Sequence, residues 1–354
     1  MDEKAKALML VGSVPYDTVE EVFEVFGGGL GTYLAAIPDG EVGSRKHWIS
    51  KVHYQVIAAH PEFEVLRRPG SENGLERLNP REPADSWLFR VKEGIERVRF
   101  GNPGWRLGYS HDAISSYFTF KTLREKGLFS ADTRFQVSIP SVNSAIAPRV
   151  FPEPGDLEKI RPGYEDAVVA ELDMLFQKVP PDDLAIQWDC ATELQDAYGG
   201  ITGLDPTTVI ERNIGQFKRL CSVIPEAALL GFHLCFGTLG GWPRFAPDDL
   251  TGAVKMANAF VKHSVRRVDW LHLPVLDRSD EHFFSPLSYL KSGDARVYLG
   301  MIHNMEGFQQ RLTTARKFLP EFGLAAYCGL GREDPAKLSM FLEDHLKAAK
   351  AAGF

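Results

Sequence analysis

Several features typical of other protein classes are missing from this sequence of 354 residues. Only four cysteines occur, too few for a disulfide framework, so we expect a reducing cytoplasm to be the location. No apolar run is long enough to span a membrane, and the first six residues do not resemble a signal peptide. No basic stripe is interleaved with aromatic residues, and the net charge is −7. We therefore expect neither a membrane nor a nucleic acid as a partner.

A glycine-rich loop for a dinucleotide or a phosphate is also missing, because no such motif follows a strand-like segment. The glycine cluster at residues 27–31 follows a helical pattern instead, and we interpret it as a helix stop and turn. This absence argues against the open doubly wound sheet, which is the main alternative among α/β folds.

The sequence does contain eight strand-like apolar runs that alternate with amphipathic helical patterns. Continuous apolar runs are typical of parallel strands buried on both faces. The pattern predicts an α/β fold, a single (β/α)8 TIM barrel spanning residues 1–354. The strand candidates are Ala7–Val14, Tyr33–Pro38, Arg134–Pro140, Leu184–Cys190, Leu229–Gly237, Val268–Val275, Val297–His303 and Gly323–Gly329.

One stretch, residues 60–110, interrupts this alternation between the second helix and the third strand. It is rich in Pro, Gly and Arg and carries Trp87, Phe89 and Trp105. We expect a short helix at Asp85–Arg99. A long insertion on an active-site face often forms a lid or a substrate wall, although a plain surface excursion would have the same composition.

His233 and Cys235 occupy positions i and i+2 at the end of one predicted strand, so their side chains point to the same face. Cys328 ends another predicted strand, 93 residues after Cys235. Two thiolates and one imidazole suit zinc, and three protein ligands leave a fourth position open, as in catalytic sites. Simple core packing is the alternative interpretation, and we favour it for Cys190 and Cys221.

Polar groups also follow most of the other predicted strands, where barrels place catalytic residues. The chain resembles the catalytic barrel of cobalamin-independent methionine synthase. That family belongs to the superfamily that also contains uroporphyrinogen decarboxylase. The decarboxylase branch of this superfamily lacks the zinc-binding cysteines, so Cys235 and Cys328 place this chain with the zinc-binding branch. The matching motifs, in chain order, are Gly12-Ser13-Val14-Pro15, Asp39-Gly40-Glu41 with Arg45, Ile186-Gln187-Trp188-Asp189, His233 with Cys235, Ile302-His303, and Cys328-Gly329-Leu330 with Arg332.

The resemblance implies a role for each matching position. His233, Cys235 and Cys328 would bind Zn²⁺, and His303 would donate or relay a proton. Glu41 and Asp189 would take part in catalysis while holding the polar part of a thiol substrate. The remaining substrate-binding positions are Ser13, Gln187 and Arg332.

The chain departs from the family where methionine synthase takes a fourth zinc ligand, a Glu at the end of strand 6. No Glu occurs in the segment Val268–Asp277, so His272, Asp277 or water could fill that position. Cys190 also stands where the family has a Glu after Asp189. These departures argue against assigning the family's substrates, homocysteine and polyglutamylated folate, to this chain.

These features predict a zinc-dependent methyl or alkyl transferase that activates a thiol as a zinc-bound thiolate for attack on an alkyl carbon. The expected partners are a small-molecule thiol and an alkyl donor. One alternative is a zinc-dependent thiol–epoxide transferase or a C–S or C–O lyase on the same barrel. The other is a non-catalytic barrel that binds a metal or a small molecule. The sequence leaves the oligomeric state open.

Overall fold

The computed structural model describes residues 7–101 and 106–354 of the chain. The expectations that concern the first six residues and Trp105 lie outside the described residues. Within the described ranges, no helix combines the length and the apolar character that a membrane crossing requires.

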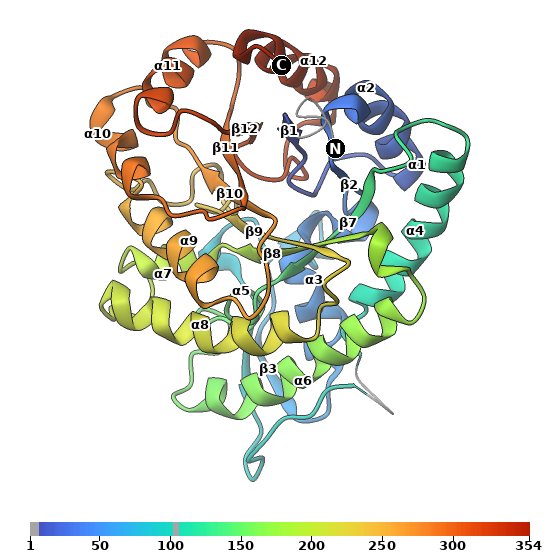
Figure 1. Ribbon diagram of the computed structural model, residues 1–354. Coiled ribbons are helices and arrows are strands. Elements are labelled where there is room, and N and C mark those ends of the chain that lie inside the picture. Colours follow the sequence, from blue (N-terminus) through green and yellow to red (C-terminus); the bar gives the residue numbers. More distant parts are fainter. Residues whose placement is uncertain (1–6, 102–105) are drawn as a thin grey trace.

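Eight parallel strands form the centre of the molecule, in the order β1-β12-β11-β10-β9-β8-β7-β2 (Figure 1). A bridge between Leu8 and Leu34 brings the two end strands together and nearly closes the barrel. The predicted (β/α)8 barrel is therefore confirmed. The strands are β1 (Leu8–Met9), β2 (Ala36–Pro38), β7 (Arg134–Pro140), β8 (Leu184–Cys190), β9 (Leu229–Leu234), β10 (Trp270–Pro274), β11 (Arg296–Ile302) and β12 (Gly323–Ala326).

Helices surround the strands on the outside (Figure 1), and the main hydrophobic core lies between the two layers. The first and last described parts of the chain lie side by side, because β1 pairs with β12 and α2 contacts α12. The helices are α1 (Val19–Val22), α2 (Gly28–Leu30), α3 (Trp48–Gln55), α4 (Tyr109–Glu125), α5 (Val142–Ala145), α6 (Asp156–Phe176), α7 (Thr192–Ala197), α8 (Pro206–Ser222), α9 (Thr251–His263), α10 (Glu281–Phe284), α11 (Phe308–Phe318) and α12 (Leu338–Ala352).

The glycine cluster at residues 27–31 lies inside a run of helical turns from α1 to Tyr33, so its interpretation as a helix stop is wrong. A Cβ at Gly27 would lie 3.0 Å from the ring of Phe129. The glycines therefore allow close packing of these turns rather than ending them.

The insertion contains strands and not the expected helix at Asp85–Arg99. An antiparallel pair joins β3 (Phe63–Arg67) to β6 (Leu88–Val91), and a smaller pair joins β4 (Ser71–Glu72) to β5 (Leu75–Glu76). Phe89 and Val91 are buried while Arg90 between them is exposed. This two-residue alternation is typical of a strand, and it explains why the helix prediction failed. Trp87 stacks on Phe89 with the ring planes 4° apart.

Helix α4, which precedes β7, was not among the expected helices. Its buried face carries Ala113, Tyr117 and Phe120, at helical spacing. Phe118 lies on the opposite face and is 61% exposed. An aromatic residue on each face blurs the apolar periodicity on which helix prediction depends.

The barrel interior is filled by side chains near the amino ends of the strands. The rings of Trp270 and Tyr298 occupy the space left by Gly231 and Gly323, where a Cβ atom would overlap them. Met9, Val11, Ala185 and Ala325 complete this interior cluster. The carboxyl ends of the strands, beyond this cluster, are the face on which barrels of this fold place their active sites.

Candidate metal centre and active-site pocket

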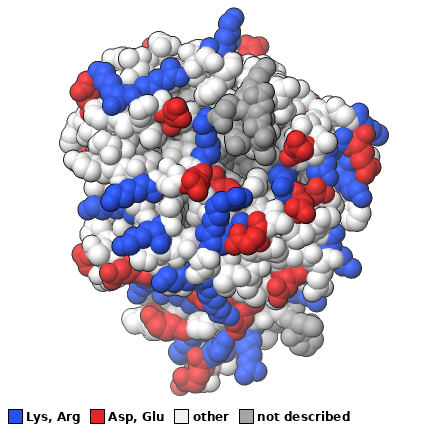
Figure 2. Space-filling model, viewed as in Figure 1, with Lys and Arg blue, Asp and Glu red and all other residues white. Residues whose placement is uncertain are grey.

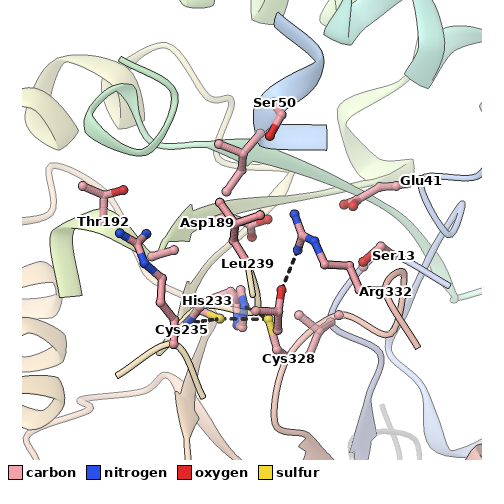
Figure 3. Close-up of a pocket in the computed structure, with 18 of the residues that line it drawn as sticks. Ser13, Glu41, Ser50, Asp189, Thr192, His233, Cys235, Leu239, Cys328 and Arg332 are labelled. Atoms are coloured by element: carbon pink, nitrogen blue, oxygen red, sulfur yellow. Dashed lines mark hydrogen bonds between the residues drawn. The ribbon is translucent and has the colours of Figure 1, made fainter. Parts of the chain in front are cut away.

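The structure brings His233, Cys235 and Cys328 together at the carboxyl end of the barrel (Figure 3). His233 lies on β9, Cys235 follows that strand directly, and Cys328 lies two residues beyond β12. All three are buried, and their ligand atoms lie within 4.8 Å of one another. Cys235 Sγ is 2.8 Å from Cys328 Sγ, and Cys328 Sγ is 3.7 Å from His233 Nε2. We call this group the triad.

A second histidine determines which nitrogen His233 presents. His233 Nδ1 lies 2.7 Å from His272 Nδ1, and His272 Nε2 lies 3.0 Å from the carbonyl oxygen of Ala326. Burial lowers the pKa of both imidazoles, that of His272 to about 4, so both are neutral. The carbonyl can only accept, so His272 Nε2 carries its proton and His272 Nδ1 accepts from His233 Nδ1. His233 Nε2 therefore keeps a free lone pair toward the cysteines.

This arrangement engages both ring nitrogens of His272, so the structure does not present it to the triad as a fourth ligand. It orients His233 instead. Asp277 does not reach the triad either, because it forms an ion pair with Arg311 and its side chain is 60% exposed. The fourth position is thus not filled by a described side chain of the Val268–Asp277 segment.

The donor set of the triad fits a zinc ion. Burial raises the pKa of the Cys235 thiol, and the neighbouring Cys328 raises it further. A divalent cation held by the triad would offset both effects by favouring the thiolates. One nitrogen and two sulfur donors in a buried cluster are ligands that zinc prefers. All four cysteines of the chain are free thiols.

Glu41 and Asp189 line the same pocket (Figure 3). Glu41 follows β2 in a turn with φ of 48°, and Gly12 allows its approach, since a Cβ there would lie 2.8 Å from Glu41 Oε1. Burial raises the pKa of the Glu41 carboxyl well above its ordinary value, and the charges of Asp189 and Asp39 raise it further. The environment of Glu41 therefore favours its protonated form.

Ser13 also lines the pocket, and its Oγ accepts a hydrogen bond from the backbone N–H of Gly331 at 3.2 Å. Gln187 does not line the pocket. It is fully buried and donates to Val11 O at 2.7 Å and to Asp189 Oδ1 at 2.8 Å. It therefore positions Asp189 and joins β8 to the end of β1.

His303 lies outside the pocket. Its ring stacks on Tyr327 with centroids 5.0 Å apart, and its Nε2 is 2.7 Å from the carbonyl oxygen of Val275. Burial lowers the pKa of His303 to about 4, so it holds no extra proton at neutral pH. The structure thus gives no support to its expected role as the proton donor.

Sequence reasoning missed most of the basic lining of this pocket. Arg332 was expected, but Arg149, Arg244 and Lys46 also line it. Arg149 lies in the segment after β7, and the end of β7 was the one predicted strand end without an assigned polar group. That gap was a usable signal, because eight loops contribute to the face.

The insertion reaches this end of the barrel. Residues Arg77–Arg81 border an opening that Lys46 and Arg332 also line. Pro83 lies close to Gly240, in the segment that follows β9. On the outer surface, Figure 2 shows acidic and basic side chains interspersed over the face in view, with no field of one sign.

No protein-family model matches the chain, and no curated protein gives a significant sequence match. Solved structures do resemble it. A B12-independent methionine synthase from Shewanella sp. W3-18-1, in complex with selenomethionine, matches with a TM-score of 0.64 and 13% identity over 98% of this chain and 97% of that chain. A Listeria monocytogenes protein, named provisionally as a vitamin-B12 independent methionine synthase, matches with a TM-score of 0.54 and 16% identity over 95% and 85%. At these identities, the likeness shows the shared fold.

Proposed function

We propose that this chain is a zinc-dependent transferase that moves a methyl or other alkyl group to a small thiol. The observation that carries the proposal is the buried His233–Cys235–Cys328 triad, with His272 directing the lone pair of His233 Nε2 inward. Such an orienting hydrogen bond is typical of histidines that bind metals. The resemblance to methionine synthase motifs supports the same reaction class.

In the proposed reaction the thiol sulfur forms a bond to the alkyl carbon, the bond from that carbon to its leaving group breaks, and the thiol proton ends on the leaving group. Zinc held by the triad would supply a positive charge that favours the thiolate form of the substrate. Asp189 and Ser13 hold the polar part of the substrate. Glu41 takes the place of His303 as the proton donor, because it lines the pocket and burial raises its pKa, which favours the protonated form.

A thiol–epoxide transferase is the second candidate, and two observations favour it. The cavity above the triad is about 90 Å³, which is small for a folate. Glu41 also lines this cavity and would protonate the alkoxide that ring opening creates, so that one C–O bond breaks while the new C–S bond forms. In both reactions the Arg77–Arg81 segment of the insertion would serve as a substrate wall.

Zinc-loaded protein incubated with small thiols and a panel of methyl donors and epoxides tests the proposal, with the S-alkylated product measured by mass spectrometry. We expect product that disappears on chelation, returns with zinc, and is not formed by Cys235→Ser. The class of donor that reacts separates the two candidates. Turnover that survives both chelation and Cys235→Ser would contradict the proposal, and zinc binding without any product would favour the non-catalytic barrel.

A further inference from the structure

We infer that the pocket above the triad binds a small thiol through an oxyanion group, held by the guanidinium groups of Arg149, Arg244 and Arg332. The three arginines come from the segments after β7, β9 and β12, and all line the pocket with the triad. The inference rests on the proposed function for the thiol, but the anion site itself is argued from the arginines.

These arginines have no acidic partner. Within residues 7–101 and 106–354, no carboxylate oxygen lies within the 4.0 Å ion-pair distance of any of the three side chains. Arg149 and Arg332 donate only to the hydroxyls of Thr192 and Thr238, and Arg149 Nε is buried without a hydrogen-bond partner. Paired arginines lie nearby, since Arg81 forms an ion pair with Glu72. Arg149 and Arg244 are half-buried, and a partly desolvated charge without a partner is costly, so such groups are typical of binding sites.

The charges of Arg244 and Arg332 act unfavourably on Arg149. Burial lowers the pKa of Arg149 to about 10, and the charges of Arg244 and Arg332 contribute to the decrease. Burial alone lowers the pKa of Arg244. Glu193 offsets part of this effect on Arg149 without forming an ion pair with it. A cluster of arginines without an ion-pair partner among the described residues is complementary to an anion, which would satisfy the unpaired N–H groups.

The geometry limits the size of the ligand. Arg332 lies above Cys328 and between Asp189 and Glu41 (Figure 3). It is close enough to the triad for the charges of Cys328 and Cys235 to act on it. The cavity of about 90 Å³ has room for roughly six to nine water-sized groups. A thiol sulfur at the triad and an oxyanion at the arginines must therefore be separated by only a few bonds.

Guanidinium groups bind carboxylates, sulfonates and phosphonates by the same paired N–H donors, so the shared chemistry is a planar or tetrahedral oxyanion. The probes that distinguish these sources are 3-mercaptopropionate and 3-mercaptopropane-1-sulfonate, with 3-mercaptopropan-1-ol as the neutral thiol of matched length. Isothermal titration calorimetry on the zinc-loaded protein measures their affinities.

We expect both anionic thiols to bind at least about tenfold more tightly than the neutral thiol, because each charge-assisted hydrogen bond contributes a factor of about ten to a hundred. Arg149→Gln and Arg244→Gln should each remove about tenfold to hundredfold of the affinity for the anionic thiols and leave the neutral thiol unaffected. Arg219→Gln, an equal change of charge at an arginine that pairs with Glu165 away from the pocket, should bind as wild type. Equal affinity for charged and neutral thiols, or Gln variants that bind as wild type, would overturn the inference.

Two further measurements keep this inference separate from the proposed function. Thermal unfolding checks that the variants fold, and relief of repulsion should leave their Tm equal to or above that of wild type. Propionate and propane-1-sulfonate, which lack the thiol, should bind the metal-free protein and lose affinity in Arg149→Gln. That result supports the anion site even if no alkyl transfer occurs. Conversely, transfer to the neutral thiol with the same kcat/KM as to the charged thiols would sustain the proposed function and overturn the anion site.

Discussion

The two ends of the barrel differ in how their charged side chains are partnered. At the amino end, Asp269 accepts from the backbone N–H of Leu230 at 2.8 Å and pairs with Arg267 at 2.7 Å and Arg266 at 3.6 Å. At the carboxyl end, Arg149 and Arg244 lie beside the triad with no acidic partner among the described residues. Satisfied charges stabilise the fold, and unsatisfied ones are available to a ligand.

Cavity size does not follow this division. The cavity at the amino end, lined by Trp270, Tyr298 and Asp269, is about 470 Å³, and the one above the triad is about 90 Å³. The larger cavity lacks the triad, and its acids and bases include the Arg267–Asp269 pair. The comparison therefore indicates that donor chemistry and unpaired charge identify the functional end, and that volume alone would select the wrong one.

The largest effect should come from removing a sulfur of the triad. Cys235→Ala should abolish measurable zinc binding, because the metal loses one of three protein ligands and the buried thiol pair is broken. Cys221→Ala is the matched control, since Cys221 is a buried free thiol on α8 away from the pocket. Metal analysis of both variants after equal zinc loading makes the test. Equal zinc in the two proteins would place the metal elsewhere.

Removing the orienting histidine should have a smaller effect on the same site. In His272→Ala, His233 loses the partner that fixes its proton on Nδ1, and zinc affinity should fall by about tenfold to a hundredfold. His345→Ala, which removes another fully buried imidazole on α12, should keep the wild-type affinity. Competition with a chromophoric chelator measures both. A smaller loss in His272→Ala than in His345→Ala would contradict the proposed orientation.

At the opposite end, Asp269→Ala should affect stability and not the metal. The substitution leaves the Leu230 N–H without its acceptor and removes the carboxylate that pairs with Arg266 and Arg267, which should lower the free energy of unfolding by about 1–3 kcal/mol. Urea denaturation measures this change, and zinc content should stay at the wild-type level. Loss of zinc together with unchanged stability would reverse the assignment of the two ends.

The smallest effect should be the pH dependence that Glu41 contributes in metal-free protein. Its pKa is raised in the folded state above the ordinary 4.5, so the folded chain holds a proton that the unfolded chain releases. This contribution to stability is fully present below the unfolded pKa and is lost as pH rises through the folded pKa. Glu41→Gln removes that loss, so the variant should gain stability relative to wild type above about pH 4.5. A stability difference that does not vary with pH would show that Glu41 is not held protonated.

Much of the fold could be predicted because the parallel strands are continuous apolar runs separated by helical periodicity. The insertion could not, since β6 is a four-residue strand whose two-residue alternation is too short to outweigh a helical interpretation. Helix α4 was missed for a related reason, because Phe118 places an aromatic ring on its exposed face.

The site was predictable where side chains belong to strand ends and was not where hydrogen bonding decides their role. The positions of His233, Cys235 and Glu41 follow from the barrel geometry. The role of His272 follows from a partner on another strand, and His303 follows the same sequence rule as Glu41 yet turns away to stack on Tyr327. Arg149 was missed because it lies nine residues beyond β7 (149 − 140), and the sequence rule covers only polar groups next to the strand ends.

X-ray absorption at the zinc edge of the zinc-loaded protein is the most direct test of the central claim that the triad holds a metal. We expect a first coordination sphere with two sulfur atoms at about 2.3 Å and nitrogen or oxygen atoms at about 2.0 Å. The sulfur contribution should halve in Cys328→Ser. A zinc ion surrounded only by nitrogen and oxygen, or a protein that binds no zinc after loading, would contradict the account.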